Sequence, residues 1–156
     1  MAEGIIVGKG ELAMKLSSPS FEHNAFIPIK FSCQGDGINP SLSIEGIPEE
    51  TKSLALIVDD PDAPGGDFVH WVVFDIPIVS RIEENSVPGK QGVNSLGKLD
   101  YVSPCPPKGV HRYFFKIYAL DTILNLKSSI TKIDLEAAMV GCILGKAELI
   151  GLYQKQ

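Results

Sequence analysis

The chain has 156 residues, 44% of them hydrophobic, which is enough for one domain over residues 1–156 with a sizeable core. Its formal net charge is −5 and no run of lysine or arginine exceeds two residues, which argues against binding to nucleic acid or an anionic membrane surface. No apolar stretch reaches the roughly 18 residues that a transmembrane helix needs.

The cysteines and the N-terminal residues bear on the cellular compartment. The chain has three cysteines, Cys33, Cys105 and Cys142, an odd number without CxxC spacing. This pattern argues against a disulfide framework and a structural zinc site, and fits a reducing cytosol. The apolar stretch at residues 5–7 is too short for a signal-peptide core. We therefore expect a cytoplasmic protein, with residues 1–16 as an edge segment or a poorly ordered one.

Turn residues divide the chain into short apolar runs. Eleven prolines and fifteen glycines leave runs of strand length between them, which predicts a mostly β fold. Strands are expected at residues 53–59, 68–76 and 112–120, which are rich in β-branched or aromatic side chains. Since several are apolar on both faces, they must be covered on each side, as in a sandwich or beneath helices. Residues 83–101 have turn chemistry without periodicity and predict a long surface loop.

The C-terminal part carries the one clear helix signal. Thr131 and Asp134 have the spacing of a capping box, and apolar residues then recur at helical spacing until Gly141. This predicts a helix over residues 132–140. Residues 143–153 alternate poorly, and we expect a short turn followed by a final strand.

The first polar segment begins where a buried strand ends. Asp60 follows an apolar run and starts a turn that Pro61 and Pro64 make stiff, with a cis bond permitted before Pro64. Such an edge can present a carboxylate to a pocket. The alternative is that Asp60 and Asp62 only cap the turn through its backbone amides.

A histidine follows in the next predicted strand. Period-2 alternation places His70 on the face of Phe68, Val72 and Phe74, with Trp71 on the opposite face. A histidine there is either a core residue with satisfied hydrogen bonds or a site residue that a nearby carboxylate orients.

The second polar segment presents two donors to one space. By the same alternation His111 and Tyr113 share a face, which suits a phosphoryl oxygen, and Arg112 lies on the other face. We expect Arg112 to form an ion pair with Asp62. If that pair is buried, removal of either partner costs about 3 to 5 kcal/mol.

A segment with three prolines precedes the second pair. Pro104, Pro106 and Pro107 exclude regular structure over residues 101–109 and predict a rigid wall. Cys105 lies within this segment and is a candidate nucleophile. A catalytic thiol needs a base and an oxyanion donor, and the sequence indicates neither.

A metal site is a further alternative. Asp60, His70 and His111 could form a set of two histidines and one carboxylate. The chain has no HExxH motif or helical histidine pair that would favour this reading.

Two strings carry a family resemblance. They are DPDAPGGDFVHW at residues 60–71 and SPCPPKGVHRYFFKIYAL at residues 103–120. In residue type and spacing they resemble the two signature regions of the phosphatidylethanolamine-binding protein family, in the bacterial and archaeal branch that is similar to the Raf kinase inhibitor protein. Weaker similarity extends from about residue 17 to residue 153.

The resemblance implies a fold and a site. The fold is a β-sandwich with a large central sheet, a smaller second sheet and short helices. The site is a pocket for phosphoryl or other small anions, without metal or cofactor. Its implied residues are Asp60, His70, His111, Tyr113 and Trp71, with the wall at Pro104, Pro106 and Pro107. The family usually has glycine at position 103, so Ser103 is expected to alter the loop or to fill part of the pocket.

We therefore expect a non-catalytic binding protein for a phosphorylated headgroup, such as phosphoethanolamine, or for a phosphorylated side chain. One alternative is a small hydrolase or phosphoryl-handling enzyme with His70 and His111 as acid and base. Another is a protein that regulates a kinase through surface loops such as residues 83–101. A protein partner and a homodimer are left open.

Overall fold

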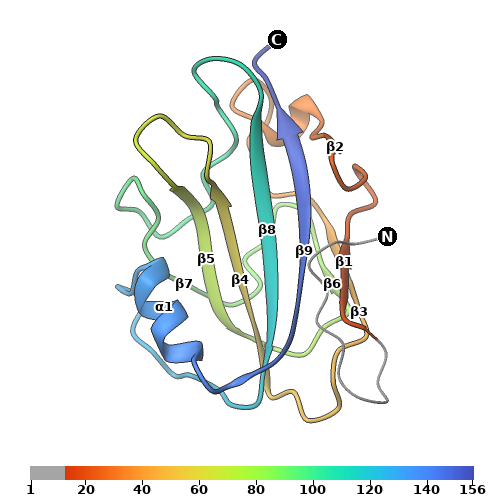
Figure 1. Ribbon diagram of the computed structural model, residues 1–156, viewed down its shortest axis with the longest axis vertical. Coiled ribbons are helices and arrows are strands. Elements are labelled where there is room, and N and C mark those ends of the chain that lie inside the picture. Colours follow the sequence, from red (N-terminus) through yellow and green to blue (C-terminus); the bar gives the residue numbers. More distant parts are fainter. Residues whose placement is uncertain (1–12) are drawn as a thin grey trace.

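The computed structural model describes residues 13–156, which form two β-sheets and one α-helix (Figure 1). The larger sheet has the strand order β2-β9-β8-β4-β5-β7, and the smaller has the order β1-β3-β6. The expectation for residues 1–16 falls mostly outside the described residues. Residues 15–17 form β1, which lies at the edge of the small sheet.

The elements have the following bounds. The strands of the large sheet are β2 (Ala25–Phe26), β4 (Ser53–Asp60), β5 (Phe68–Ile76), β7 (Lys90–Gln91), β8 (His111–Leu120) and β9 (Ile143–Tyr153). Those of the small sheet are β1 (Lys15–Ser17), β3 (Leu42–Glu45) and β6 (Arg81–Ile82). The helices are the 3₁₀-helix η1 (Ile29–Phe31) and the α-helix α1 (Lys132–Met139).

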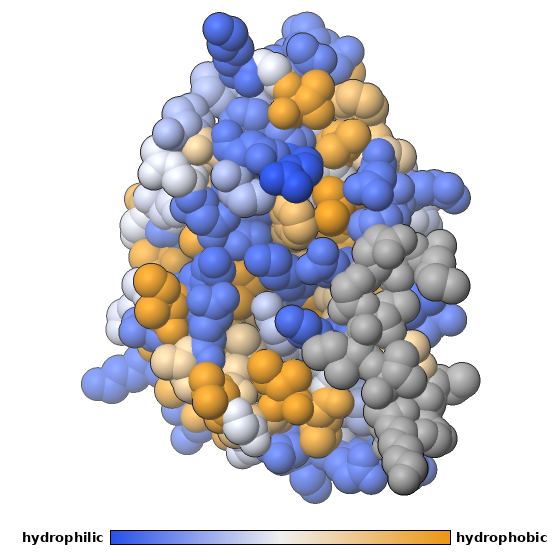
Figure 2. Space-filling view, viewed as in Figure 1, coloured by the Kyte–Doolittle hydropathy of each residue, from blue (hydrophilic) through white to orange (hydrophobic). Residues whose placement is uncertain are grey.

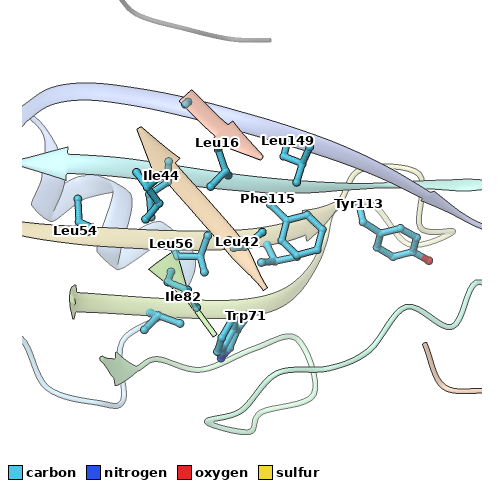
Figure 3. Packing of buried hydrophobic residues seen from close by; sticks show 14 of the residues in the cluster. Leu16, Leu42, Ile44, Leu54, Leu56, Trp71, Ile82, Tyr113, Phe115 and Leu149 are labelled. Atoms are coloured by element: carbon cyan, nitrogen blue, oxygen red, sulfur yellow. The ribbon is translucent and has the colours of Figure 1, made fainter. Parts of the chain in front are cut away.

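Both faces of the large sheet are covered, as its apolar strands require. One face packs against the small sheet around a core that includes Leu56, Trp71 and Phe115 (Figure 3). The other face packs against α1 through Leu135 and Met139. All eight residues of β4, in the middle of the sheet, are buried. The mostly β, two-sheet fold is therefore confirmed.

The capping box at the start of α1 is also confirmed. The Thr131 hydroxyl accepts a hydrogen bond from the Asp134 amide at 3.3 Å. The Asp134 carboxylate accepts one from the Thr131 amide at 3.0 Å. These bonds satisfy two of the amides that a helix start leaves without partners.

The prediction for the C-terminal segment was only partly right. Residues 143–153 form one strand of 11 residues, without the initial turn that we expected. The inward positions of this strand include Gly145, Ala147 and Gly151. Because these residues have no side chain or only a methyl group, the alternation of apolar and polar residues is hard to see in the sequence. A Cβ at Gly151 would lie 2.5 Å from Cγ1 of Ile27, so packing requires glycine there. The predicted loop at residues 83–101 is interrupted by the short strand β7.

The cysteine prediction was wrong. Cys33 and Cys105 form a disulfide, with their Cα atoms 5.4 Å apart and a sequence separation of 72. Cys142 is a free cysteine. The fold brings the pair together, and no sequence spacing indicates this. The cysteine argument for a reducing cytosol fails with it. Among residues 13–156 no helix is long and apolar enough to cross a membrane.

Candidate functional site

A cavity of about 350 Å³ lies at one end of the large sheet. This is the upper end in Figure 1, where β4 ends and β8 begins. The cavity's polar lining residues are Asp60, His70, Ser103, His111 and Tyr113. Most of the other lining residues are apolar, including Phe68, Leu96, Pro106 and Pro107. The two segments separated in sequence therefore meet around one space.

Strand β8 presents its two site residues as alternation predicts. His111 and Tyr113 both line the cavity, and their ring centroids lie 6.5 Å apart in a stacked arrangement. Tyr113 lies beyond Phe115 at the end of the core, and its hydroxyl points away from the apolar cluster (Figure 3). Arg112 is exposed on the other face. The regular ladder between β8 and β9 in this region keeps the alternation intact.

Strand β5 reaches the cavity through a β-bulge. Val58 pairs with Trp71 and Asp59 pairs with Val69, so His70 is an extra residue without a partner on β4. The extra residue shifts the alternation of side chains by one position, so the residues before and after it do not follow one continuous period-2 pattern. His70 therefore lines the cavity while its neighbour Trp71 lies in the core between the sheets.

Because of the bulge, His70 does not share a face with Val72 and Phe74, contrary to the prediction from alternation. Val72 and Phe74 pack in the cluster beneath α1, on the opposite side of the sheet from the cavity. His70 instead shares the cavity with Phe68, and their ring centroids lie 4.8 Å apart. The prediction of residues on the same face as His70 was right for Phe68 and wrong for Val72 and Phe74. The prediction that Trp71 lies on the opposite face was also wrong, because Trp71 and His70 lie on the same side of the sheet as Tyr113.

Asp60 orients His111. The Asp60 Oδ2 atom lies 2.6 Å from Nδ1 of His111, and both side chains are buried. The Asp60 Oδ1 atom accepts the Asp62 amide at 2.8 Å. The carboxylate thus caps its turn and also fixes the imidazole. Since a carboxylate accepts at Nδ1, the neutral imidazole keeps its proton there, and Nε2 is the nitrogen left for a ligand.

A backbone carbonyl orients His70 in the same way. Its Nδ1 atom lies 2.6 Å from the Val102 oxygen, which can only accept, so Nδ1 carries the proton. Burial lowers the pKa of His70 below its usual value, although the Val102 hydrogen bond and the charge of Asp60 act in the opposite direction. His70 is therefore neutral at pH 7, and its Nε2 atom is an acceptor.

Tyr113 supplies a donor. Burial, and after it the charge of Asp60, raises the pKa of the Tyr113 hydroxyl well above its usual value. The hydroxyl therefore stays protonated at physiological pH. Its ring also makes an edge contact with His70, with centroids 5.2 Å apart. This contact joins the residues of β5 and β8 within one site.

The affinity of this site for anions depends on the protonation state of its two imidazoles. In its neutral form the site offers one hydroxyl donor and two imidazole acceptors. Protonation of either imidazole turns an acceptor into a donor and adds a positive charge. Affinity for an anion should therefore rise as the histidines take up protons.

The ion pair between Arg112 and Asp62 is present. The Arg112 Nη2 and Nε atoms lie 2.9 Å from the two carboxylate oxygens of Asp62. The hydrogen bond from Arg112 lowers the pKa of Asp62, and the charge of the guanidinium acts in the same direction. The side chains are 51% and 30% exposed, so the larger cost expected for a buried pair does not apply.

Two residues that we expected at the site do not line the cavity. Trp71 is buried in the core, and its Nε1 atom donates to Gln91 Oε1 at 2.7 Å. Pro104 is also buried, and its carbonyl accepts the Cys33 amide at 3.0 Å. Pro106 and Pro107 do line the cavity.

Sequence reasoning missed Leu96 as a lining residue. It comes from the loop at residues 83–101 and is 56% exposed. The only available signal was the length of that loop, because long loops in compact domains often carry function.

Ser103 lines the cavity, but its hydroxyl is close to a neighbouring turn. Its Oγ atom lies 3.3 Å from the position that a Cβ on Gly37 would occupy. Gly37 has a φ of +69°, a conformation that favours glycine. Ser103 therefore packs against this turn.

The nucleophile and metal alternatives gain no support from this geometry. Cys105 is bonded to Cys33 and has no thiol. Within the described part of the chain, no group of three or more His, Cys, Asp or Glu residues is arranged to hold a metal ion.

Comparisons with known proteins agree with the fold. The family model "Phosphatidylethanolamine-binding protein" matches residues 17–154. A UPF0098 protein of Methanothermobacter thermautotrophicus is 49% identical over 150 residues, which are 91% of this chain and 99% of that protein. A UPF0098 protein of Pyrococcus horikoshii is 47% identical and covers 96% of this chain and 82% of its own length. The chain belongs to the phosphatidylethanolamine-binding protein family.

Solved structures give the same result. A putative phosphatidylethanolamine-binding protein homologue from Chlamydia trachomatis, CT736, has a TM-score of 0.89 and 44% identity over 92% of this chain and 98% of its own. Escherichia coli YbcL has a TM-score of 0.83 and 28% identity over 92% of this chain and 99% of its own. YbcL is described as a new member of the mammalian phosphatidylethanolamine-binding protein family.

Proposed function

We propose that this protein is a non-catalytic binding protein whose cavity takes a phosphoryl group, carried by a small headgroup such as phosphoethanolamine or by a phosphorylated side chain. The observation that carries the proposal is the pair of fixed imidazoles. His70 and His111 each use Nδ1 for a protein acceptor, so each has Nε2 left for a ligand. Tyr113 adds a protonated hydroxyl beside them.

The cavity also suits an organic substituent on the phosphoryl group. Its volume of about 350 Å³ lies at the lower end of the range for small-molecule pockets, about 300 to 1,000 Å³. The polar residues cover one part of the surface, and residues such as Phe68, Leu96 and Pro107 supply apolar walls. We therefore expect organic phosphates to bind more tightly than inorganic phosphate.

The absence of an obvious free nucleophile in the described cavity favours binding over catalysis. Both oxygens of Asp60 are engaged, Cys105 is in a disulfide, and Ser103 lies against the Gly37 turn. The buried pair of Asp60 and His111 is the one feature that suits a general base. For this reason the hydrolase alternative should be tested directly, by measuring turnover of a panel of phosphoesters.

The kinase-regulating alternative has less support on the face that Figure 2 shows. Hydrophobic residues there form small separate groups among hydrophilic ones, rather than one broad apolar area. Protein interfaces usually have a well-packed apolar centre. A pull-down that survives mutation of the cavity would favour this alternative.

Calorimetric titration with inorganic phosphate and phosphoethanolamine between pH 5.5 and 8.5 tests the proposal. Affinity should fall as the pH rises, because the bound anion favours the charged imidazoles. His111→Ala should weaken binding strongly, whereas His23→Gln, which lies outside the cavity, should leave it unchanged. Equal affinity across this pH range would contradict the role of the imidazoles. Phosphoester turnover that is lost in His111→Ala would favour the enzyme.

A further inference from the structure

The Cys33–Cys105 disulfide forms part of the cavity wall. Cys105 lines the cavity, and Cys33 lies just after η1. Both cysteines are exposed to solvent. A reductant can therefore reach this bond from outside, and breaking it would change a surface that the ligand meets.

Apart from the packing of the buried Pro104 and Pro106, little else holds this wall in place. Within the described chain, a single hydrogen bond joins residues 103–110 to other segments, from the Cys33 amide to the Pro104 carbonyl at 3.0 Å. Three of these residues are prolines, which have no amide proton to donate. The disulfide is thus the one covalent link between the wall and the turn after η1.

The other end of the disulfide is well anchored. Ser32, next to Cys33, donates its hydroxyl proton to Tyr153 Oη at 2.9 Å. Tyr153 in turn donates to Gln34 Oε1 at 2.6 Å. Tyr153 is the last residue of β9 and is buried. Reduction should therefore release the wall and leave the turn that carries Cys33 in place.

The wall is also connected to an imidazole of the site. Val102, immediately before it, accepts from Nδ1 of His70 and donates its amide to the His70 carbonyl at 2.9 Å. A mobile wall would loosen the acceptor that fixes the His70 tautomer. Reduction should therefore alter both the apolar side of the cavity and one of its polar groups.

We propose that the Cys33–Cys105 disulfide is a thiol–disulfide exchange site that controls ligand affinity, an inference that rests on the proposed function of the cavity. A thiolate of an external dithiol, small or protein-borne, attacks one sulfur and breaks the S–S bond. The second thiolate of the reductant then resolves the mixed disulfide. The dithiol gives up two electrons and two protons and becomes a disulfide, while Cys33 and Cys105 become thiols. Only the oxidised protein holds the wall against the cavity.

The experiment compares oxidised protein with protein reduced by dithiothreitol. Inorganic phosphate should bind about tenfold more weakly to the reduced form, because the wall must be ordered again on binding. Reoxidation should restore the affinity. Cys142→Ser is the matched control and should behave like the native chain, since Cys142 is outside the disulfide.

Amide hydrogen exchange gives a readout that does not depend on the ligand. Reduction should speed exchange at Val102 and Cys33, whose amides donate to His70 and Pro104, at least tenfold, and leave Tyr113 in the β8 ladder unchanged. A Cys33→Ser, Cys105→Ser double variant should match the reduced form. If this variant does not fold, reversible reduction of the native chain carries the test.

The outcomes are distinguishable. If phosphate binds neither form, the proposed function fails, and the exchange rates alone decide whether the disulfide holds the wall. If dithiothreitol leaves the disulfide intact in the folded protein, the exchange site is overturned. Equal affinity and equal exchange rates in both forms would also overturn it.

Discussion

The two sides of the cavity are built in different ways. His111 and Tyr113 lie on β8, which pairs with β9 at ten positions, and Asp60 lies at the end of the fully buried β4. The opposite side, residues 103–110, has no strand and depends on proline stiffness, one hydrogen bond and a disulfide.

The two sides are suited to different parts of ligand binding, which are hydrogen bonding to the anion and apolar contact with its substituent. Hydrogen bonds to an anion need fixed directions, and the strand side holds its polar groups by backbone ladders and buried partners. Apolar contacts are less directional, so small shifts of the proline side leave the polar groups of the site in place, as long as Val102 still accepts from His70. Affinity for the phosphoryl group should therefore depend on the strand side and on the Val102 carbonyl that orients His70, and preference among organic substituents on the proline side.

The largest expected effect comes from the carboxylate on the strand side. Asp60→Ala removes the partner of buried His111 and the cap of the Asp62 amide. The free energy of unfolding should fall by about 2 kcal/mol, as for loss of a buried hydrogen bond to a charged group. Urea denaturation at pH 7 measures this change. Asp62→Ala, in the same turn but in an exposed ion pair, should cost less than about 1 kcal/mol. Equal costs would show that burial is not what separates the two carboxylates.

Tyr113 should affect binding with little effect on stability. Tyr113→Phe removes only the hydroxyl donor, and phosphate affinity should fall about tenfold, as for loss of one hydrogen bond to a charged group. Calorimetric titration at pH 6 measures it. Tyr118→Phe is a matched control on the same strand, because Tyr118 packs toward α1, on the other face of the sheet. Unchanged affinity in Tyr113→Phe would remove Tyr113 from the site.

His70 should make stability depend on pH. Its pKa is lowered by burial, so the unfolded chain, with a histidine pKa near 6.5, binds the proton more readily. The contribution of neutral His70 to stability is therefore present above about pH 6.5 and is lost as the pH falls through the lower folded-state pKa. Urea denaturation from pH 7.5 to pH 5 should show a steeper loss for the native chain than for His70→Gln. Parallel curves would mean that His70 is not buried in its neutral form.

The smallest effect is expected at the proline side. Ser103→Gly should change phosphate affinity by less than about threefold, because the Ser103 hydroxyl lies against the Gly37 turn. Titration of this variant beside the native chain measures it. A large gain in affinity would instead indicate that Ser103 fills part of the ligand space, as the departure from the family pattern suggested.

The sequence was a good guide where a segment's own pattern determines its structure. β4, β5 and β8 were predicted within one residue at each end, because their apolar runs are bounded by turn residues. The facing of His111 and Tyr113 followed from alternation in a strand without a bulge at that end. The capping box at Thr131 is likewise a local signal.

The sequence was a poor guide where a feature depends on a distant partner. The bulge at His70 appears only in the register of β5 against β4, so alternation alone gave the wrong neighbours. The disulfide joins residues 72 apart in the chain. Trp71 lies in the core, where Gln91 accepts from its indole nitrogen, and nothing local links those two residues.

A crystal structure of the oxidised protein soaked with phosphoethanolamine at pH 6 tests the central claim most directly. We predict a phosphoryl group within hydrogen-bond distance of the Tyr113 hydroxyl and of Nε2 of His70 and His111. The Asp60 carboxylate should remain bonded to Nδ1 of His111. A cavity without ligand, or a phosphoryl group bound away from both imidazoles, would contradict the proposed function.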